Sequence, residues 1–270
     1  MLVRIDDPDD PRVAAYTAIR ERDLAGHVAL AGHGNRFIAE GEVVLRVLLT
    51  RSRFAVESLL LAERRLKLLE SLPVRAPVYV AAQSVMDRIT GFHIHRGVLA
   101  VGRRGPETRP DTLLGALGPR ALVLGLIGVS NHDNVGGIFR NAAAFGAGAV
   151  LLDRGTCDPL YRKAIRVSVG ASLVTPFARV ESADAMLAHL ADSGFEVVAL
   201  SPRGPEPISR VPRSGRVALL LGAEGPGLPA EILDRVRSMR IPIVPGFDSL
   251  NVATASGIAL YELAGRLDGA

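Results

Sequence analysis

The chain has 270 residues, of which 48% are hydrophobic and 22% are charged, a composition typical of a folded globular protein and unlike that of a disordered one. No apolar run approaches the roughly 20 residues of a membrane-spanning helix, the polar N-terminal residues lack the apolar core of a signal peptide, and a single cysteine excludes an internal disulfide and a cysteine-rich zinc site. We therefore expect a cytoplasmic protein without a membrane segment. Residues 1–110 hold 17 basic and 13 acidic residues, against 15 of each in residues 111–270, so affinity for a polyanion is expected first in the N-terminal part.

Residues 1–104 are predicted to form a small α/β domain in which strands and helices alternate. A short strand runs into a helix over residues 35–49. Further strands are predicted at residues 57–62, 77–81 and 97–104, and further helices at residues 63–72 and from residue 84 onward. The polar, proline-bearing stretch Arg103–Asp111 then indicates a linker, which we place at residues 105–118.

Residues 119–270 are predicted to form a second α/β domain around a parallel sheet. Its apolar runs are longer and uninterrupted, which is typical of strands that helices cover on both faces. These runs lie at residues 121–129, 149–153, 196–200 and 217–222. The covering helices are predicted at residues 134–145, 159–169, 183–194, 229–239 and 251–267.

Three loops of the second domain combine glycines with polar side chains directly after a strand, at residues 128–137, 222–228 and 242–251. Ligands of open α/β sheets bind at the carboxyl ends of the strands, so we expect one site built from the first, fifth and sixth strands of this domain. The first loop has neither the G-x-G-x-x-G spacing of a dinucleotide site nor the G-K-[ST] of a phosphate-binding loop. A nucleotide-dependent oxidoreductase is therefore disfavoured.

The same loops carry three motifs in order. The first is Asn134, Gly136, Gly137 and Arg140; the second is Gly222, Glu224, Gly227 and Leu228; the third is Ile241-Pro242, Ser249-Leu250-Asn251-Val252 and Tyr261-Glu262. Together with residues 161–177, which hold Lys163, Arg166, Ser168 and Gly170, they resemble the SPOUT superfamily of RNA methyltransferases, specifically its SpoU (TrmH-like) branch. Asn141, where serine or threonine is common, and Ala253-Thr254 depart slightly from the family pattern. Upstream, Asn35, Arg36, Glu40 and Gly41 look like the opening of the L30e-like substrate-binding domain of many rRNA-modifying members.

This resemblance implies a C-terminal domain tied in a deep trefoil knot, a homodimer, and S-adenosylmethionine (AdoMet) bound in the knot. The implied reaction is methyl transfer from AdoMet to a ribose 2′-hydroxyl of RNA, with 23S rRNA favoured because members dedicated to tRNA commonly have short helical extensions instead of a second domain. Two alternatives remain: a tRNA 2′-O-methyltransferase, and a non-catalytic RNA-binding scaffold of the same fold. A non-catalytic scaffold would tolerate substitution of the motif residues, whereas all of them are present in this sequence.

Four residues are predicted to be catalytic: Arg140, Glu224, Asn134 and Asn251. Arg140 would act as a general base or, since arginine holds its proton strongly, as a clamp for a phosphate and the developing alkoxide. A helix-surface salt bridge is the structural alternative for this arginine. Glu224 would accept hydrogen bonds from Arg140 or from backbone amides. Asn134 would cap its helix or contact the target nucleotide.

The cofactor is expected to be held largely by main-chain atoms. Gly222, Ile241 and Leu250 match the family positions that contact adenine and ribose, with Ser249 beside them and Ile243 and Ala253 as the wall. RNA contacts are predicted for Arg140, Asn134, Arg36 and Arg96. His93 and His95 would share one face of a strand, but two histidines without a third ligand do not make a metal site, so no metal is expected.

Overall fold

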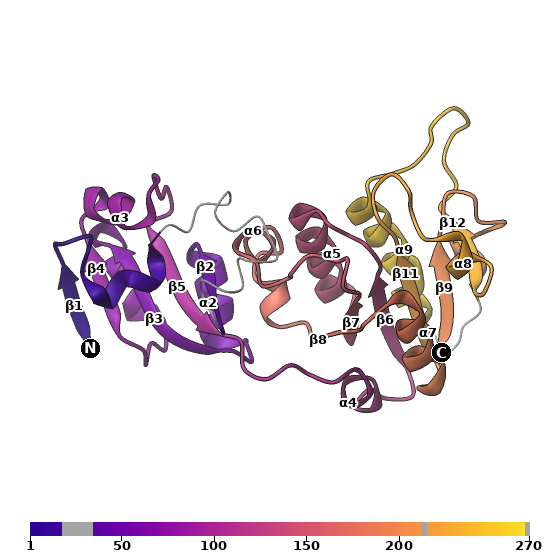
Figure 1. Cartoon of the computed structure of the whole chain (residues 1–270), viewed down its shortest axis with the longest axis horizontal. Coiled ribbons are helices and arrows are strands. Elements are labelled where there is room, and N and C mark those ends of the chain that lie inside the picture. The colour runs from indigo at the N-terminus through magenta and orange to yellow at the C-terminus, as the bar shows by residue number, and fades with distance from the viewer. Residues whose placement is uncertain (18–34, 212–214, 268–270) are drawn as a thin grey trace. The chain divides into compact units, whose positions relative to one another are not determined.

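The chain folds into two units, which the computed structural model describes over residues 1–17, 35–211 and 215–267 (Figure 1). The first unit comprises Met1–Pro106 and Leu160–Val174, and the second comprises Glu107–Pro159 and Thr175–Ala270. The predicted domains were residues 1–104 and 119–270. Leu160–Val174 belongs to the second of these along the chain, but it packs with the first unit. The chain therefore passes from one unit to the other three times.

The first unit is built on a five-stranded mixed sheet with the strand order β1-β4-β3-β5-β2. The strands are β1 (Leu2–Ile5), β2 (Arg36–Glu40), β3 (Ala55–Ala62), β4 (Val78–Ala81) and β5 (Val98–Arg103). The helices are η1 (Pro11–Tyr16), α2 (Glu42–Thr50), η2 (Glu63–Ser71), α3 (Gln83–Thr90), α6 (Arg162–Val167) and η3 (Ala171–Leu173). Strand β5 runs antiparallel to β2 and β3, whereas β4 runs parallel to β1 and β3.

Most predicted elements of this unit are confirmed, and three elements differ from the prediction. Strand β1 was not predicted; it has four residues at the edge of the sheet and pairs with β4 alone, so its pattern is too short to stand out. Element η1 was not predicted either. The helix expected at residues 63–72 is the 3₁₀ helix η2, in which no residue is buried, so no apolar face favours a regular α-helix.

A buried ion pair explains why α6 packs with the first unit. The Glu40 carboxylate, at the end of β2, accepts hydrogen bonds from Nη1 of Arg162 at 2.7 Å and from Nη1 of Arg166 at 3.2 Å. The Arg162 guanidinium also lies 5.0 Å from the centroid of the Phe92 ring. Side chains of Glu40 and Arg162 are both more than nine-tenths buried, so removing either one would leave the other charge uncompensated. Glu40 and Arg166, matched in two separate family segments, thus meet in one contact.

The second unit is built on a seven-stranded sheet in which every pairing is parallel, with the order β10-β12-β9-β11-β6-β7-β8. The strands are β6 (Ala121–Leu126), β7 (Ala149–Leu152), β8 (Phe177–Arg179), β9 (Glu196–Leu200), β10 (Glu206–Pro207), β11 (Arg216–Leu221) and β12 (Arg237–Arg240). The helices are α4 (Pro110–Gly115), α5 (His132–Ala144), α7 (Ala183–Asp192), η4 (Ile208–Arg210), α8 (Ala230–Leu233) and α9 (Val252–Leu267).

Helices cover both faces of this sheet, as the uninterrupted apolar runs predicted. Successive residues of a strand point to opposite faces. In β6, Leu122 and Leu124 join the core under α5 and α9, whereas Ala121 and Val123 join the core under α4 and α7. All six residues of β6 are buried, so both faces must be apolar and the strand shows no polar alternation. The predicted α/β class with a parallel sheet is confirmed.

The segment before the third motif differs from its prediction. Residues 229–239 were expected to be one helix, but α8 ends at Leu233 and β12 begins at Arg237. In β12, Met239 is buried between the partly exposed Ser238 and Arg240, a strand alternation too short to be recognised beside the helical pattern. Strand β12 ends at Arg240, directly before the motif residues Ile241-Pro242, since proline cannot donate to a sheet ladder. The short strands β8 and β10 were likewise not predicted.

Candidate active site

The loop between β6 and α5 is fixed by the end of the neighbouring strand. The Gly128 amide, at a φ of +69°, donates to Oδ1 of Asp153 at 3.0 Å. Thr156 also donates its hydroxyl to this carboxylate oxygen, at 2.7 Å, and accepts from the amide of Val129 at 3.2 Å. These contacts set the direction in which α5 starts. Asp153 and Thr156 were not among the predicted site residues, although the position of Asp153 at the end of a buried strand was a usable signal.

Asn131, and not Asn134, caps α5. The Asn131 side chain accepts a hydrogen bond from the amide of Asp133 at 2.8 Å. The capping role considered for Asn134 is therefore wrong: this residue lies within the first turn of the helix and is only 4% exposed. A buried side-chain amide requires partners, and Asn134 finds them on two other loops.

Asn134, Glu224 and Asn251 form what we call the Asn–Glu–Asn cluster. Asn134 donates its Nδ2 to Oε1 of Glu224. Asn251 donates its Nδ2 to Oδ1 of Asn134 at 2.9 Å and to Oε1 of Glu224 at 3.2 Å. Asn134 lies in the first turn of α5 after β6, Glu224 lies in the loop after β11, and Asn251 ends the loop after β12. These strands are the first, sixth and seventh of the described second unit, whereas the first, fifth and sixth were expected from the sequence.

The cluster also starts the C-terminal helix. Oδ1 of Asn251 accepts from the amide of Ala253 at 2.9 Å and from that of Thr254 at 3.2 Å, the arrangement of an N-cap. Helix α9 then packs on α5 through Asn141, which donates to the Ala253 carbonyl at 2.7 Å and to the Ser256 hydroxyl at 2.9 Å. The family departure at Asn141 thus has a structural role, since one amide satisfies two acceptors of the neighbouring helix.

Arg140 lies on the exposed side of α5, away from the cluster. Arg140 is six positions after Asn134, which is about one and two-thirds turns of a helix with roughly 3.6 residues per turn, so the two side chains leave α5 in different directions. Within the described ranges, neither Glu224 nor any other acid pairs with its guanidinium. The expected hydrogen bond from Arg140 to Glu224 is therefore wrong, because the cluster asparagines take the Glu224 carboxylate. The alternative of a helix-surface salt bridge is not observed either.

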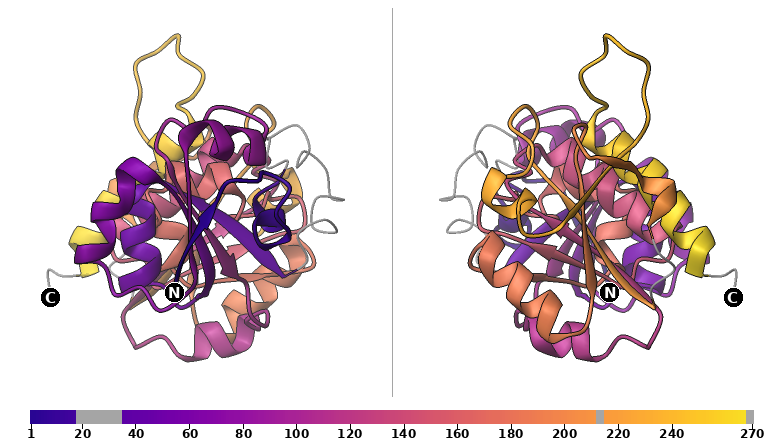
Figure 2. Two further views of the ribbon diagram at one scale, coloured as in Figure 1. Left: turned by 90° about the vertical axis from the view of Figure 1, so that its left-hand side faces the viewer. Right: turned by 90° about the vertical axis from the view of Figure 1, so that its right-hand side faces the viewer.

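The predicted cofactor residues divide into a packed group and an exposed group. Gly222 is buried in a tight turn in which a Cβ would lie 2.3 Å from the Gly227 carbonyl carbon, so its own loop already requires glycine there. Ile241 and Ala253 pack against the core under α5 and α9. Ile243, Ser249 and Leu250 are exposed on the loop after β12, which projects from the second unit (Figure 2).

Exposed apolar side chains gather on this loop and on α9, a feature that motif analysis did not identify. Val244 and Phe247 are 69% and 73% exposed on the loop, and Tyr261 is 68% exposed on α9. Ile243, Leu250 and Ile258 are each 38% exposed. Exposed apolar side chains of this size, if they form one surface, mark an interaction site. We call these six residues the apolar patch.

Cys157, on the loop after β7, is not a nucleophile. Burial raises the pKa of its thiol to about 12, and the charge of Asp158 acts in the same direction. A thiol with so high a pKa holds almost no reactive thiolate near pH 7. Its side chain is partly buried and packs against the core under α5 and α9.

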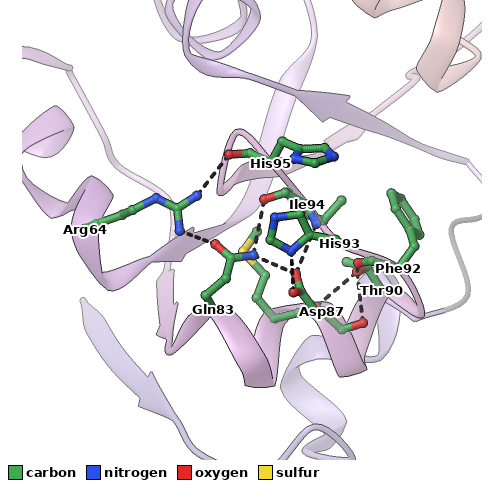
Figure 3. Close-up of polar contacts among 9 residues, drawn as sticks. Arg64, Gln83, Asp87, Thr90, Phe92, His93, Ile94 and His95 are labelled. Atoms are coloured by element: carbon green, nitrogen blue, oxygen red, sulfur yellow. Dashed lines mark hydrogen bonds and ion pairs between the residues drawn. The ribbon is translucent and has the colours of Figure 1, made fainter.

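In the first unit, the two arginines predicted to contact RNA differ in their surroundings. Arg36 pairs with Glu57, with 2.6 Å between Nη2 and Oε1. Arg96 is exposed just before β5. His93 and His95 were expected on a strand, but they lie in the loop between α3 and β5 (Figure 3). Over the described part of the chain, no group of three or more His, Cys, Asp or Glu residues is arranged to hold a metal ion, and no helix is long and apolar enough to cross a membrane.

Comparison with known proteins gives one consistent result. A model of the SpoU rRNA Methylase family matches residues 121–261. An uncharacterized tRNA/rRNA methyltransferase of Mycobacterium tuberculosis is 44% identical over 269 residues, which cover 95% of this chain and 89% of that protein. Among solved structures, the AdoMet-bound rRNA methyltransferase from Sinorhizobium meliloti superposes with a TM-score of 0.79 at 24% identity, covering 98% of each chain. An RNA 2′-O ribose methyltransferase superposes with a TM-score of 0.75 at 24% identity, covering 99% of each chain.

Proposed function

The chain belongs to the SpoU rRNA Methylase family, and we propose that it transfers a methyl group from AdoMet to a ribose 2′-hydroxyl of 23S rRNA. The observation that carries this proposal is the Asn–Glu–Asn cluster, which ties together three loops at the carboxyl ends of β6, β11 and β12. Support comes from a relative named tRNA/rRNA methyltransferase and from structural neighbours described as AdoMet-bound and as an RNA 2′-O ribose methyltransferase. The trefoil knot stays a prediction.

The residues around these loops fit AdoMet chemically. Ile241 is half-buried, and Ile243 and Leu250 are exposed apolar side chains of the loop that follows it; these three would form the slot for adenine. The hydroxyl of Ser249 and the main chain of the same loop would supply hydrogen bonds to the ribose. When bound, the cofactor supplies an electrophilic methyl group on a sulfonium that leaves as a neutral thioether.

The protein side chains would align and stabilise the attacking ribose. Arg140, exposed and with no acidic partner among the described residues, would bind the phosphate next to the target ribose and stabilise the alkoxide that develops as the 2′-hydroxyl gives its proton to water. The Asn–Glu–Asn cluster would hold the three loops in one geometry, because in-line attack depends on precise alignment of the oxygen behind the methyl carbon. In this proposal Arg140 acts on RNA directly, whereas Glu224 acts through the two asparagines.

We further propose that a second copy of the chain covers the apolar patch in a homodimer. The patch is built from the loop that would also hold the cofactor and from α9, so the same segment would serve both purposes. Leaving side chains as large as Phe247 and Tyr261 in water is unfavourable by roughly 25 cal/mol for each Å² of apolar surface.

The direct test is transfer of labelled methyl from AdoMet to purified 23S rRNA, 16S rRNA and tRNA, with wild type, Arg140→Ala and Arg109→Ala in parallel. Arg109 is a matched control because it is 81% exposed and lies at the start of α4. We expect label in 23S rRNA with wild type and Arg109→Ala, and a loss of at least about 100-fold with Arg140→Ala, the scale of removing one electrostatic stabiliser. The labelled dinucleotide should resist alkali, because the 2′-oxygen that attacks the phosphodiester is methylated.

Other outcomes distinguish the alternatives. Label confined to tRNA would replace the rRNA assignment while keeping the chemistry. AdoMet binding without label in any naked RNA, but with label in ribosomal particles, would identify an assembled substrate. RNA binding without AdoMet binding would support the non-catalytic scaffold and overturn the proposal.

A further inference from the structure

We propose that Asp153 and Thr156, on the turn after β7, are positioning residues for methyl transfer. They hold the loop after β6 in one conformation, so that α5 presents Arg140 to the RNA in a fixed direction. This inference rests on the proposed function, because it takes methyl transfer as the reaction of the site. It concerns the alignment of the RNA and not the binding of AdoMet.

Two side chains of the turn hold two consecutive main-chain amides of the loop after β6. Oδ1 of Asp153 accepts from the Gly128 amide at 3.0 Å, and the hydroxyl oxygen of Thr156 accepts from the Val129 amide at 3.2 Å. The Cys157 amide then donates to the Val129 carbonyl at 3.0 Å. Val129 is thus held through both its amide and its carbonyl. Because Thr156 is 3% exposed and Val129 is 1% exposed, water does not easily replace these hydrogen bonds.

The turn lies directly against the loop that it holds. A Cβ on Gly155 would be 3.3 Å from Cα of Gly128. Gly128 itself has a φ of +69°, a conformation that glycine adopts readily. On its other side, a Cβ on Gly128 would be 3.5 Å from Cβ of Ala223, the residue before Glu224. A displacement of Gly128 would therefore change how the loop after β6 meets the loop that carries Glu224.

Arg179, at the end of β8, fixes the turn itself. Its Nη1 donates to the Thr156 carbonyl at 3.2 Å and lies 3.5 Å from the Asp153 carbonyl oxygen. Strands β8, β7 and β6 are neighbours in the sheet (Figure 1). Hydrogen bonds therefore run along the carboxyl edge of the sheet, from β8 through the turn to the loop after β6. Since the chain leaves the second unit over Leu160–Val174, Arg179 also joins the outgoing segment to the returning one.

The loop after β6 leads into the helix that carries the side chains proposed to act on RNA. Asp153 holds the start of this loop at Gly128, and the hydrogen bond from Asn134 to Glu224 holds the first turn of α5. The direction of α5 thus depends on both attachments. Arg140 follows on the same helix, so releasing one attachment would move its guanidinium. A misplacement of about 1 Å can slow a reaction by about 100-fold, even when the substituted residue is remote from the chemistry.

The Asp153 carboxylate can be removed while Thr156 keeps an acceptor. The Thr156 hydroxyl has one proton, and its oxygen lies 2.7 Å from Oδ1 of Asp153 and 3.0 Å from the Leu126 carbonyl oxygen. Without the carboxylate, this proton can turn to the Leu126 carbonyl, whereas the Gly128 amide loses the acceptor that it has here. We therefore expect loss of Asp153 to release the loop after β6 without unfolding the chain.

The test uses the full chain and measures two quantities. One is kcat for methyl transfer to the RNA that wild type methylates, at saturating AdoMet; the other is the AdoMet Kd by titration. The variants are Asp153→Ala, Asp153→Asn, Thr156→Val and Thr156→Ser, with Glu181→Ala as the matched control. Glu181 is an acid shortly after β8 that pairs with Arg154 on the same turn. Their side chains are 74% and 75% exposed, so this ion pair contributes little.

We expect Asp153→Ala and Thr156→Val to lower kcat about 10- to 100-fold while the AdoMet Kd changes less than about 3-fold. The Kd should persist because the residues proposed to hold AdoMet follow β11 and β12. Asp153→Asn and Thr156→Ser should keep at least about a third of the wild-type kcat, since each retains the oxygen that accepts the amide. The double variant Asp153→Ala/Thr156→Val should lose less than the product of the single losses, because both act on one loop. Glu181→Ala should match wild type.

Three results would overturn the inference: a wild-type kcat in Asp153→Ala, an AdoMet Kd that weakens as much as kcat falls, or an Asp153→Asn variant as slow as Asp153→Ala. The second would show general loosening of the site, and the third would show a role for the charge in place of the hydrogen bond. Thermal unfolding followed by circular dichroism identifies any variant that is unfolded at the assay temperature. If Asp153→Ala is unfolded there, the comparison of Thr156→Val with Thr156→Ser decides by the same criteria.

The wild type separates this inference from the proposed function. A wild type that binds no AdoMet and transfers no methyl would refute the proposed function and, with it, the positioning role. An active wild type beside an equally active Asp153→Ala would refute the positioning role alone.

Discussion

Glu224 holds two asparagines, and this arrangement predicts how its substitution affects stability. Asn134 is 4% exposed, so removing Glu224 would leave the buried Nδ2 donor of Asn134 without the acceptor that it has here. We expect Glu224→Ala to lower the free energy of unfolding by about 1–3 kcal/mol. Glu224→Gln should cost less than about 1 kcal/mol, because the glutamine carbonyl can still accept both hydrogen bonds. Urea denaturation followed by circular dichroism measures both values. Equal urea midpoints for wild type and Glu224→Ala would show that the Asn–Glu–Asn cluster does not form.

The residues of the site were predictable to different degrees. Asn134, Glu224 and Asn251 could be found because each stands at a fixed position in a motif after a strand. Their hydrogen-bond partners could not be predicted. Whether Glu224 binds Arg140 or the two asparagines depends on which side of α5 faces the other loops. Asp153 acts through the amide of Gly128, a contact over 25 positions of sequence that no local pattern records.

At the scale of the elements, α5 packs so closely on α9 that position 137 has room only for glycine. A Cβ on Gly137 would lie 2.8 Å from Cβ of Ala253, closer than side chains normally approach. We expect Gly137→Leu to destabilise the fold by at least about 1–3 kcal/mol through overpacking and to weaken AdoMet binding, since α9 begins beside the cofactor loop. Gly115→Ala is the matched control, because a Cβ there meets no atom within 4 Å. Calorimetric melting and an AdoMet titration test both effects; a Gly137→Leu variant as stable as Gly115→Ala would contradict this packing.

The sequence predicted the long elements well and the short ones poorly, for one physical reason. Strand β6 is buried on both faces, so six consecutive apolar residues identify it without knowledge of its partners. Strand β12 has only four residues and one fully buried side chain, Met239, and it exists because β9 and β10 pair with it. Such a strand is specified by its tertiary neighbours. The local sequence pattern around it therefore predicts a helix.

At the scale of the whole molecule, the division into units does not follow the family boundary. The family model matches residues 121–261 without interruption, yet Leu160–Val174 packs with the first unit through Glu40 and Arg162. Burial of this pair could not be predicted, because charged residues are normally exposed and only their mutual contact makes burial tolerable. A domain assignment read along the chain therefore separates residues that fold together.

The apolar patch makes the oligomeric state of the whole molecule testable. Wild type should have a mass in solution of twice 28.6 kDa by light scattering after size exclusion. Phe247→Asp and Tyr261→Asp should shift it to the monomer mass, because a charge placed in an apolar interface must be desolvated. Val43→Asp is the matched control, since Val43 is 53% exposed on α2 in the first unit, outside the patch. All three substitutions replace exposed side chains, so each variant should fold. A monomeric wild type at micromolar concentration would refute the dimer, and loss of the dimer in Val43→Asp would place the interface on a different surface.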